Sequence, residues 1–262
     1  MIDEKKQQDS RESSIILELN EINKTFYSDS GEKIRTLKGL NLHVTEGEFI
    51  TLVGATGCGK TTLLNLIAGL ETPDDGQLSL GKGLRLGDNV AYVFQHYTLF
   101  PWRSTLSNVC FGLQMRGIGR KKRKNEAMQL LSKVGLESFE NTYPYELSGG
   151  MRQRAAIAQA LAIKPKLLLM DEPFGALDDS TRRELQQMLT ELWQENQTTI
   201  IFVTHNIDEA VLLGDKVLVF SERPGRIVRK FDVELPRPRN SVTKEFTNLF
   251  MQIRQSLSAQ LD

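Results

Sequence analysis

The chain has 262 residues, of which 40% are hydrophobic and 25% charged, which is ordinary for a globular protein with one sizeable core or a core with a subdomain. Lysine plus arginine and aspartate plus glutamate each total 33, and the resulting net charge of zero excludes attraction to nucleic acid or acidic lipid through the overall field. Two cysteines, Cys58 and Cys110, exclude a disulfide scaffold, and we expect both thiols to be reduced.

No apolar stretch of the sequence approaches the roughly 20 residues that a helix needs to cross a bilayer. Residues 1–14 are polar and lack the apolar core of a secretion signal, so we expect them to form a flexible tail. The chain is therefore expected to be soluble by itself and to act at a membrane only through a partner.

The first hundred residues predict mainly strands, with a helix among them. Alternating apolar and polar residues at the start are typical of a half-buried strand. The helix is expected to bury one face, formed by Leu63, Leu64, Ile67 and Leu70. The expected elements are a strand over 15–26, a turn over 28–34, two strands within 35–54, a helix over 61–70, a glycine-punctuated hairpin near 78–90 and a strand over 89–95.

The rest of the sequence alternates helices with strands, which indicates an α/β sheet. Residues 105–160 read as an inserted helical subdomain, in which the charge run RKKRK at 120–124 is expected to solvate a helix. The expected elements are helices within 105–145, a helix over 148–163 capped by Ser148, a buried strand within 166–173, a helix over 180–196, a buried strand over 198–205, one or two hairpin strands within 215–235 and an amphipathic helix near 243–258.

The stretch GATGCGKT at residues 54–61 follows a predicted strand, opens a predicted helix and fits the pattern G-x-x-x-x-G-K-[ST]. Glycines let such a loop curl so that its backbone N–H groups point inward, where a Cβ would block an approaching phosphate. Lys60 adds a full positive charge to that of the helix N-terminus, and the Thr61 hydroxyl can bind magnesium. This P-loop is expected to hold phosphates through Gly54, Ala55, Thr56, Gly57, Cys58, Gly59, Lys60, Thr61 and Thr62.

Two carboxylates end the apolar run LLLMDEP at 167–173. Asp171, at the end of the predicted strand, suits a water-mediated contact with magnesium. Glu172 is expected to point the other way in an extended chain and to poise a water for attack on the γ-phosphorus. With the P-loop, these two residues predict a nucleoside triphosphatase.

The run LSGGMRQR at 147–154 resembles the signature of the ATP-binding cassette (ABC) family, here with Met151 after the second glycine. The signature loop, Ser148–Gly150, repeats the logic of the P-loop, because a serine and two glycines present N–H groups and a helix N-terminus to a phosphate. Further motifs resemble the family in order: Gln95 at the Q-loop, GALD at 175–178 as the D-loop and His205 as the switch histidine.

This resemblance, over about residues 15–235, implies a RecA-like P-loop NTPase core of the α/β class with an N-terminal antiparallel β-subdomain and an inserted α-helical subdomain that carries the signature. It divides the chain into a tail over 1–14, an ABC ATPase domain over 15–240 with its helical subdomain at about 105–160, and a C-terminal helix or tail over 241–262. In the family, the P-loop and the signature loop that hold one ATP belong to different subunits. The resemblance therefore implies a second cassette, either an identical or a related chain.

The resemblance also implies ATP and Mg²⁺ as ligands, and roles for particular residues. Glu172 would be the general base or position the water, His205 would contact the γ-phosphate, and Gln95 would couple the nucleotide to a membrane partner. Phe26 would stack on adenine, with Tyr27 as the alternative. The expected catalytic residues are Glu172, His205, Lys60 and Gln95; the expected ATP contacts outside the P-loop are Phe26, Gln95, Ser148, Gly149, Gly150, Asp178 and His205; the expected metal ligands are Thr61, Gln95 and Asp171.

The stretch LFPW at 99–102 resembles importers for nitrate, sulfonate, taurine and bicarbonate, and 174–193 and 222–239 resemble the same group. These surfaces are expected to face permease subunits, with Trp102 gripping a short permease helix rather than lying in the core. The group implies an ATPase on the cytoplasmic side of the cell membrane, transmembrane permease subunits and an extracytoplasmic binding protein. The transported substance cannot be derived from this chain.

Two other functions remain open on the sequence. One is a soluble ABC ATPase that acts on nucleic acid or ribosomes, although such proteins usually have a coiled-coil insertion or two cassettes in one chain, and neither is visible. The other is a cassette of an exporter or lipid-transfer system, against which LFPW and ERPGRIV (222–228) argue by resemblance alone.

Overall fold

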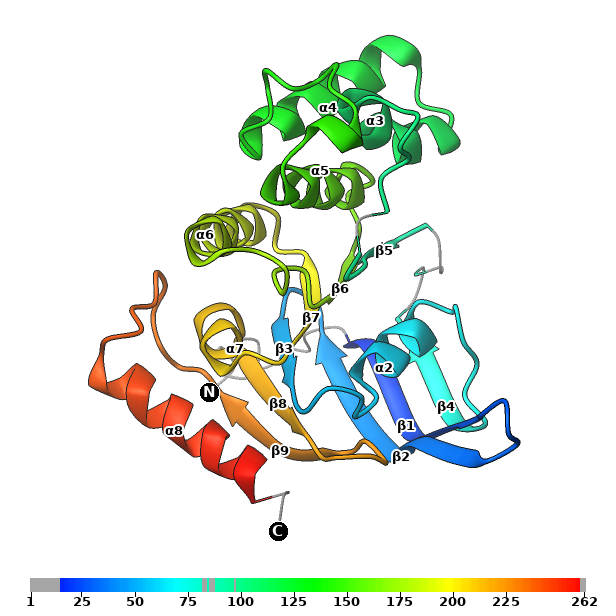
Figure 1. Cartoon of the computed structure of the whole chain (residues 1–262), viewed down its shortest axis with the longest axis vertical. Helices are drawn as coiled ribbons and strands as arrows, with labels where there is room; N and C mark the ends of the chain where they lie inside the picture. The colour runs from blue at the N-terminus through cyan, green and yellow to red at the C-terminus, as the bar shows by residue number, and fades with distance from the viewer. Residues whose placement is uncertain (1–14, 82–83, 85–87, 97, 260–262) are drawn as a thin grey trace, which may run out of the picture.

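The computed structural model describes residues 15–81, 84, 88–96 and 98–259. The expected tail over 1–14 lies outside the described residues, as does the part of the expected hairpin that falls on 82–83 and 85–87. Two sheets and a lobe of helices make up the described chain (Figure 1).

A six-stranded sheet forms the centre of the molecule, in the order β5-β6-β7-β3-β8-β9. The neighbours from β5 to β8 are parallel, and β9 closes one edge antiparallel to β8. β3, β6 and β7 are buried along their whole length, as strands of a parallel sheet covered on both faces must be. The strands are β3 (Phe49–Val53), β5 (Val90–Val93), β6 (Leu167–Asp171), β7 (Thr199–Thr204), β8 (Lys216–Phe220) and β9 (Ile227–Asp232).

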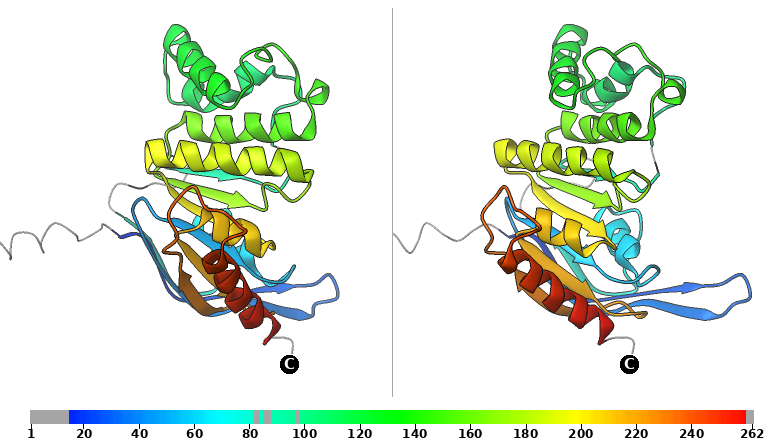
Figure 2. Two further views of the ribbon diagram at one scale, coloured as in Figure 1. Left: turned by 90° about the vertical axis from the view of Figure 1, so that its left-hand side faces the viewer. Right: turned by 60° about the vertical axis from the view of Figure 1, so that its left-hand side comes forward.

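A smaller antiparallel sheet lies beside the first, in the order β2-β1-β4. Its long β1–β2 hairpin projects to one side of the molecule (Figure 2). The strands are β1 (Ile15–Tyr27), β2 (Lys33–Thr45) and β4 (Asp75–Leu80). This sheet carries Phe26 near the end of β1, opposite Ile34 of β2.

Helices cover both faces of the central sheet. A helical lobe formed by α3, α4, η1 and α5 stacks on α6 at one end of the molecule, and α8 lies at the other end (Figures 1 and 2). The helices are α2 (Lys60–Ile67), α3 (Thr105–Met115), α4 (Arg120–Lys133), η1 (Pro144–Glu146), α5 (Gly149–Ala162), α6 (Asp179–Asn196), α7 (Ile207–Leu213) and α8 (Lys244–Ser258).

The central sheet separates two hydrophobic cores, because successive side chains of a strand point to opposite faces. On β6, Leu168 and Met170 enter the core under the helical lobe and α6, whereas Leu167 and Leu169 enter the core shared with α2 and the antiparallel sheet. The P-loop leaves β3 at the edge of the second core, so it is held between the two sheets.

The expected α/β class, the antiparallel subdomain and the inserted helices are confirmed. One core assignment is wrong: α2 ends at Ile67, the chain turns at Gly69 with a φ of 69°, and Leu70 is 59% exposed. The sequence also does not predict α7, whose seven residues are too few to show a clear period. Among the described residues, no helix combines the length and the apolar character that a membrane span requires.

Candidate functional site

The P-loop turns directly from the buried end of β3 into α2, and glycine is required where neighbours crowd it. A Cβ on Gly54 would lie 2.9 Å from Cβ of Phe220 on β8. Gly59, the residue before α2, has a φ of 110°, which L side chains rarely adopt. The Lys60 side chain is folded back into this loop and buried, and its Nζ donates to the carbonyls of Gly54 at 2.8 Å and Ala55 at 2.9 Å. The loop thus presents a cation and a helix N-terminus at one place.

Asp171 lies beside the start of α2, where β6 ends. The Thr61 hydroxyl donates to its Oδ1 at 3.1 Å, and the residue is only 4% exposed. Burial raises the pKa of this carboxyl, the hydrogen bond from Thr61 lowers it, and the neighbouring charge of Glu172 raises it again. A hydroxyl and a carboxylate are therefore held together at the mouth of the P-loop.

Glu172 faces His205 across the ends of β6 and β7. The distance between Glu172 Oε2 and His205 Nδ1 is 2.9 Å, and the Glu172 N–H donates to the Val203 carbonyl at 2.9 Å. The sequence analysis derives the direction of the Glu172 side chain from the alternation of an extended strand. That reason is wrong, because the backbone does not continue as a strand at this residue. Glu172 has a φ of 43°, a left-handed conformation that is costly for this residue type and is found mostly where function requires it.

A buried carboxylate is connected, through a threonine hydroxyl, to the backbone beside His205. Glu209 of α7 accepts a hydrogen bond from the Thr204 hydroxyl at 2.6 Å and one from the Gln186 amide at 3.3 Å. Thr204 in turn accepts from the N–H of Asn206, the residue after His205. Burial raises the pKa of Glu209, whereas the Thr204 hydrogen bond and the charge of Arg182 lower it. Sequence analysis misses this residue, because α7 itself is not predicted.

A cavity of about 370 Å³, the P-loop cavity, brings most of the predicted residues together. Phe26 lines it and the 71% exposed Tyr27 does not, which favours Phe26 for contact with a base. The predicted residues that line it are Phe26, Thr56, Gly57, Gly59, Lys60, Thr61, Thr62, Gln95 and Glu172. The lining residues that the sequence analysis does not name are Ile34, Thr36 and Arg223.

Four further predicted residues lie in or beside the P-loop but do not line this cavity. Gly54, Ala55 and His205 line an adjacent cavity of about 310 Å³, together with the end of α8. Cys58 is buried, with its Sγ 3.6 Å from Lys60 Nζ, so it fills space in the loop.

The signature loop lies away from the P-loop cavity. Ser148 is exposed and accepts a hydrogen bond from the Met151 N–H at 3.3 Å, which makes it the N-cap of α5 as expected. Asp178 is likewise exposed and caps α6, and hydrogen bonds from Ser180 and Thr181 hold its pKa well below the usual range. None of Ser148, Gly149, Gly150 and Asp178 is among the described residues that line the P-loop cavity. Figure 1 shows the start of α5 in the helical lobe, away from the start of α2.

The donors in the P-loop cavity fit a magnesium ion bound together with phosphate. Mg²⁺ prefers oxygen ligands, keeps several waters and is commonly held by only one or two protein groups plus phosphates. The Thr61 hydroxyl and Gln95 line the cavity, and Asp171 is hydrogen-bonded to Thr61. Among the described residues, no cluster of three or more His, Cys, Asp or Glu side chains could hold a metal without such help.

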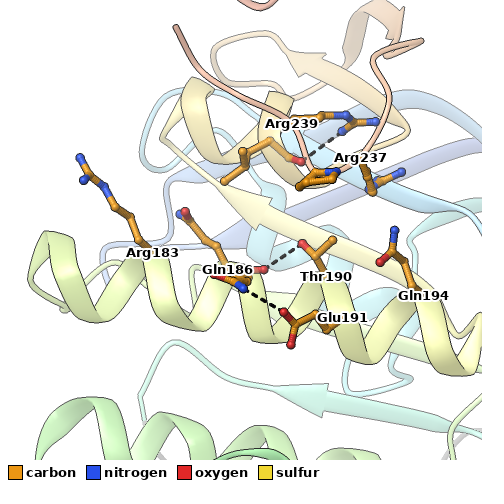
Figure 3. A pocket seen from close by; sticks show the side chains of 10 residues that line it. Arg183, Gln186, Thr190, Glu191, Gln194, Arg237 and Arg239 are labelled. Carbon is orange, nitrogen blue, oxygen red and sulfur yellow. Dashed lines mark hydrogen bonds between the residues drawn. The ribbon is translucent and has the colours of Figure 1, made fainter.

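A larger cavity of about 550 Å³ lies elsewhere, between one face of α6 and residues 237–239 (Figure 3). Two of the three arginines that line it, Arg237 and Arg239, are already occupied by protein acceptors. Arg237 donates to Asp215 and the Leu213 carbonyl and covers the Trp193 ring, and Arg239 donates to the carbonyls of Val211 and Gly214. Arg237 and Arg239 therefore stabilise the chain that follows α7. The P-loop cavity is the candidate site.

Two of the three stretches expected to face a permease, 99–102 and 222–239, have different surroundings. Trp102 is 71% exposed and lies 5.6 Å from the ring of Phe100, so the expectation that it lies outside the core is confirmed. At the start of 222–239, Arg223 donates two hydrogen bonds to the P-loop carbonyl of Gly57. Part of this stretch thus belongs to the P-loop side of the molecule.

Residues 37–175 match a family model described as ABC transporter. A nitrate import ATP-binding protein of Synechocystis sp. is 46% identical over 235 residues, which cover 87% of this chain and 88% of that protein. A taurine import ATP-binding protein of Rhizobium johnstonii is 45% identical over 214 residues, which cover 81% of this chain and 82% of that protein.

The fold is similar to that of solved ATP-binding cassettes. A dimeric, post-hydrolysis structure of one cassette with bound ADP and Pi matches with a TM-score of 0.73 at 32% identity. The match covers 84% of this chain and all of the other. The geometry of the P-loop cavity is therefore found in a chain whose relatives bind and hydrolyse ATP.

Proposed function

The chain belongs to the ABC transporter family and is an ATPase, and from this premise we propose that it is the ATP-hydrolysing subunit of an importer for a small anion. The observation that supports the enzymatic part best is the convergence of five side chains at the P-loop. Lys60 is folded into the loop, Thr61 is bonded to Asp171, and Glu172 is bonded to His205.

In this proposal the P-loop cavity holds ATP. Phe26 stacks on adenine, the N–H groups of residues 54–62 and Lys60 bind the phosphates, and Glu172 accepts a proton from the attacking water. His205 holds the Glu172 carboxylate and contacts the γ-phosphate. The left-handed backbone of Glu172 aims its carboxylate at the site before the substrate arrives, which lowers the cost of ordering it later.

Magnesium would be held by Thr61, Gln95 and, through water, Asp171. When bound, it would neutralise charge that develops on the phosphate oxygens. Burial raises the pKa of Asp171 in spite of the nearby charge of Lys60, and a bound cation would stabilise the ionised carboxylate.

The signature loop serves the other subunit of a cassette dimer in this proposal. It lies outside the P-loop cavity of its own chain, and its exposed Ser148 and the N-terminus of α5 suit a phosphate brought by a second copy. The related cassette crystallised with ADP and Pi is a dimer. When ATP binds, two such sites close and bring the cassettes together. Gln95 and Asp178 would respond to that closure.

We further propose that the partner is a pair of transmembrane permease subunits, with this chain on the cytoplasmic side of the membrane and a binding protein on the other. The exposed Trp102, with Phe100 beside it, supplies an aromatic surface for a permease helix. Relatives named for nitrate and for taurine import share about the same identity with this chain, so they support a small oxyanion and no single one. The proposed ATPase domain is residues 15–240, with the helical subdomain at about 105–160 and a C-terminal unit at 241–262.

Copurification tests the transport proposal. The tagged chain is purified in mild detergent from its own membranes, and the ATPase of the purified complex is measured with and without the retained membrane protein. We expect a hydrophobic permease to be retained, and Trp102→Ala to lose it while Met251→Ala, an exposed residue of α8, does not. Retention of RNA or DNA that salt removes, with no membrane protein, would contradict the proposal.

A further inference from the structure

Residues 222–225, here named the ERPG segment, reach from the end of β8 back to the P-loop. The guanidinium of Arg223 donates to the Gly57 carbonyl through both Nε, at 3.1 Å, and Nη2, at 2.9 Å. These contacts join residues 166 positions apart in the sequence. No P-loop motif predicts them, because the motif describes only contiguous residues.

Backbone contacts fix the ERPG segment against both the P-loop and β2. The Gly225 N–H donates to the Thr36 carbonyl at 2.8 Å, and the Gly225 carbonyl accepts from the Lys38 N–H at 3.2 Å. A Cβ on Gly225 would overlap the carbonyl oxygen of Cys58, so only glycine allows this approach. The Arg223 side chain therefore starts from a backbone that is held on both sides.

The carbonyl that Arg223 holds determines where the next N–H points. Gly57 has a φ of 78°, and in a trans peptide the C=O of Gly57 and the N–H of Cys58 point in opposite directions. With the carbonyl held by Arg223, the Cys58 N–H points to the opposite side of the peptide, where it makes a long 3.4 Å hydrogen bond to the Ala55 carbonyl. A phosphate oxygen would replace that carbonyl as the acceptor of this N–H.

Arg223 also carries charge to the P-loop cavity. Lys60 and Arg223 are the cationic side chains among the described residues that line it, and Glu172 is the acidic one. Lys60 is buried and bonded to loop carbonyls, whereas Arg223 is exposed.

We propose that Arg223 is a nucleotide-positioning residue. It orients the Gly57–Cys58 peptide for phosphate binding and adds the second positive charge of the P-loop cavity. The proposal rests on the proposed ATP site and names a side chain that the family motifs do not include. It makes the ERPG segment part of the nucleotide site, connected through β2 to the sheet that carries Phe26.

The test compares four purified variants with the parental protein: Arg223→Ala, Arg223→Lys, Arg223→Gln and Arg226→Ala. Arg226 is an exposed arginine three residues along the chain and is the matched control. Equilibrium binding of ATP and ADP gives Kd, steady-state ATPase gives KM and kcat, and thermal unfolding without nucleotide reports the fold. Arg223→Lys retains charge without the forked donor, and Arg223→Gln retains a donor without charge.

We expect Arg223→Ala to raise the Kd and KM for ATP about tenfold, a usual consequence of losing a charge-assisted contact, and to change kcat less than twofold. The Kd and KM of Arg223→Lys and Arg223→Gln should lie between those of Arg223→Ala and those of the parental protein. Arg226→Ala should match the parental protein. The inference is overturned if Arg223→Ala binds ATP normally. It is also overturned if all Arg223 variants lose kcat and thermal stability together, which indicates a structural role. Failure of the parental protein to bind ATP would contradict the proposed ATP site instead.

Discussion

The chain contains two glycine-rich loops that lead into helix N-termini, and their surroundings differ. The P-loop is enclosed: Lys60 is bonded to its carbonyls, Arg223 holds one peptide from outside, and Asp171 meets the first turn of α2. The signature loop is open, with an exposed Ser148 whose side chain caps its own helix. The P-loop is enclosed by its own chain, whereas the signature loop is exposed at the start of α5.

The difference indicates how the two loops are built. Two cations and two carboxylates lie around the P-loop, which in the proposed function would hold a phosphate through binding and chemistry. In the same proposal the signature loop would approach and release with each cycle, which requires exposed donors and a rigid support. The signature loop has both, because Gly150 packs so closely on Thr181 of α6 that a Cβ would overlap the threonine Cγ2.

The largest expected effect concerns the chemistry of the enclosed loop. Glu172→Gln should lower ATP turnover by about 10³-fold, within the usual range for a general base, and leave ATP binding intact. The variant should accumulate as an ATP-bound dimer, measured by size-exclusion chromatography with and without ATP. Glu184→Gln, on an exposed α6 residue paired with Arg154, is the control. Parental turnover with the parental dimer population would contradict the role of Glu172.

The next prediction tests whether the open loop serves a second chain. Ser148→Arg and Lys60→Ala should each lose about 10²-fold or more of the ATPase, a typical loss for a phosphate-stabilising group. Mixed together, the two variants should recover activity, because each mixed dimer regains one site with an intact P-loop and an intact signature loop.

Subunit exchange is the control for this mixture. Either variant mixed with itself should stay inactive, and a fluorescence-labelled pair should show that mixed dimers form. No recovery despite exchange would mean that both loops act within one chain, and the comparison between them would have to be abandoned.

A smaller effect is expected from the support of the open loop. Gly150→Ala should lower the free energy of unfolding by about 1–3 kcal/mol, because the new methyl overpacks against Thr181. Adding Thr181→Ser removes the threonine methyl group that the new methyl would overlap, and it should recover most of the lost free energy of unfolding. Gly119→Ala, where a Cβ meets nothing within 4 Å, should cost less. Urea unfolding of the four proteins gives the values, and an unchanged midpoint for Gly150→Ala would contradict the packing role.

The smallest expected effect is on the stability of the nucleotide-free protein. The pKa of Asp171 is raised, so its contribution to stability is present below the ordinary carboxyl pKa and is lost as pH rises through the raised value. Asp171→Asn should therefore raise Tm at pH 7.5 by about 2–4 °C, which is roughly 1 kcal/mol for a domain of this size. The gain should shrink toward pH 4, and ATPase should be lost. A gain that does not depend on pH would exclude burial of this charge as its cause.

The sequence predicts the local parts of the site. GATGCGKT and LSGGMRQR are contiguous, so their meaning depends on a strand before them or a helix after them, and those elements form as expected. The direction of Glu172 is predicted for the wrong reason, because strand alternation does not reveal a left-handed residue. Glu209 and Arg223 are missed, because nothing nearby in the chain indicates which loop they will contact.

By itself, the sequence determined the fold class, the order of most of the elements and the two glycine-rich loops, because periodicity, glycine content and helix capping act within a few residues. Only the tertiary structure decided which loop is enclosed. It brought the ERPG segment against the P-loop and left Ser148 exposed, because contacts between residues more than 160 positions apart depend on how the two sheets pack. A short motif can show that phosphate is bound, whereas the packing around it determines how many chains complete the site.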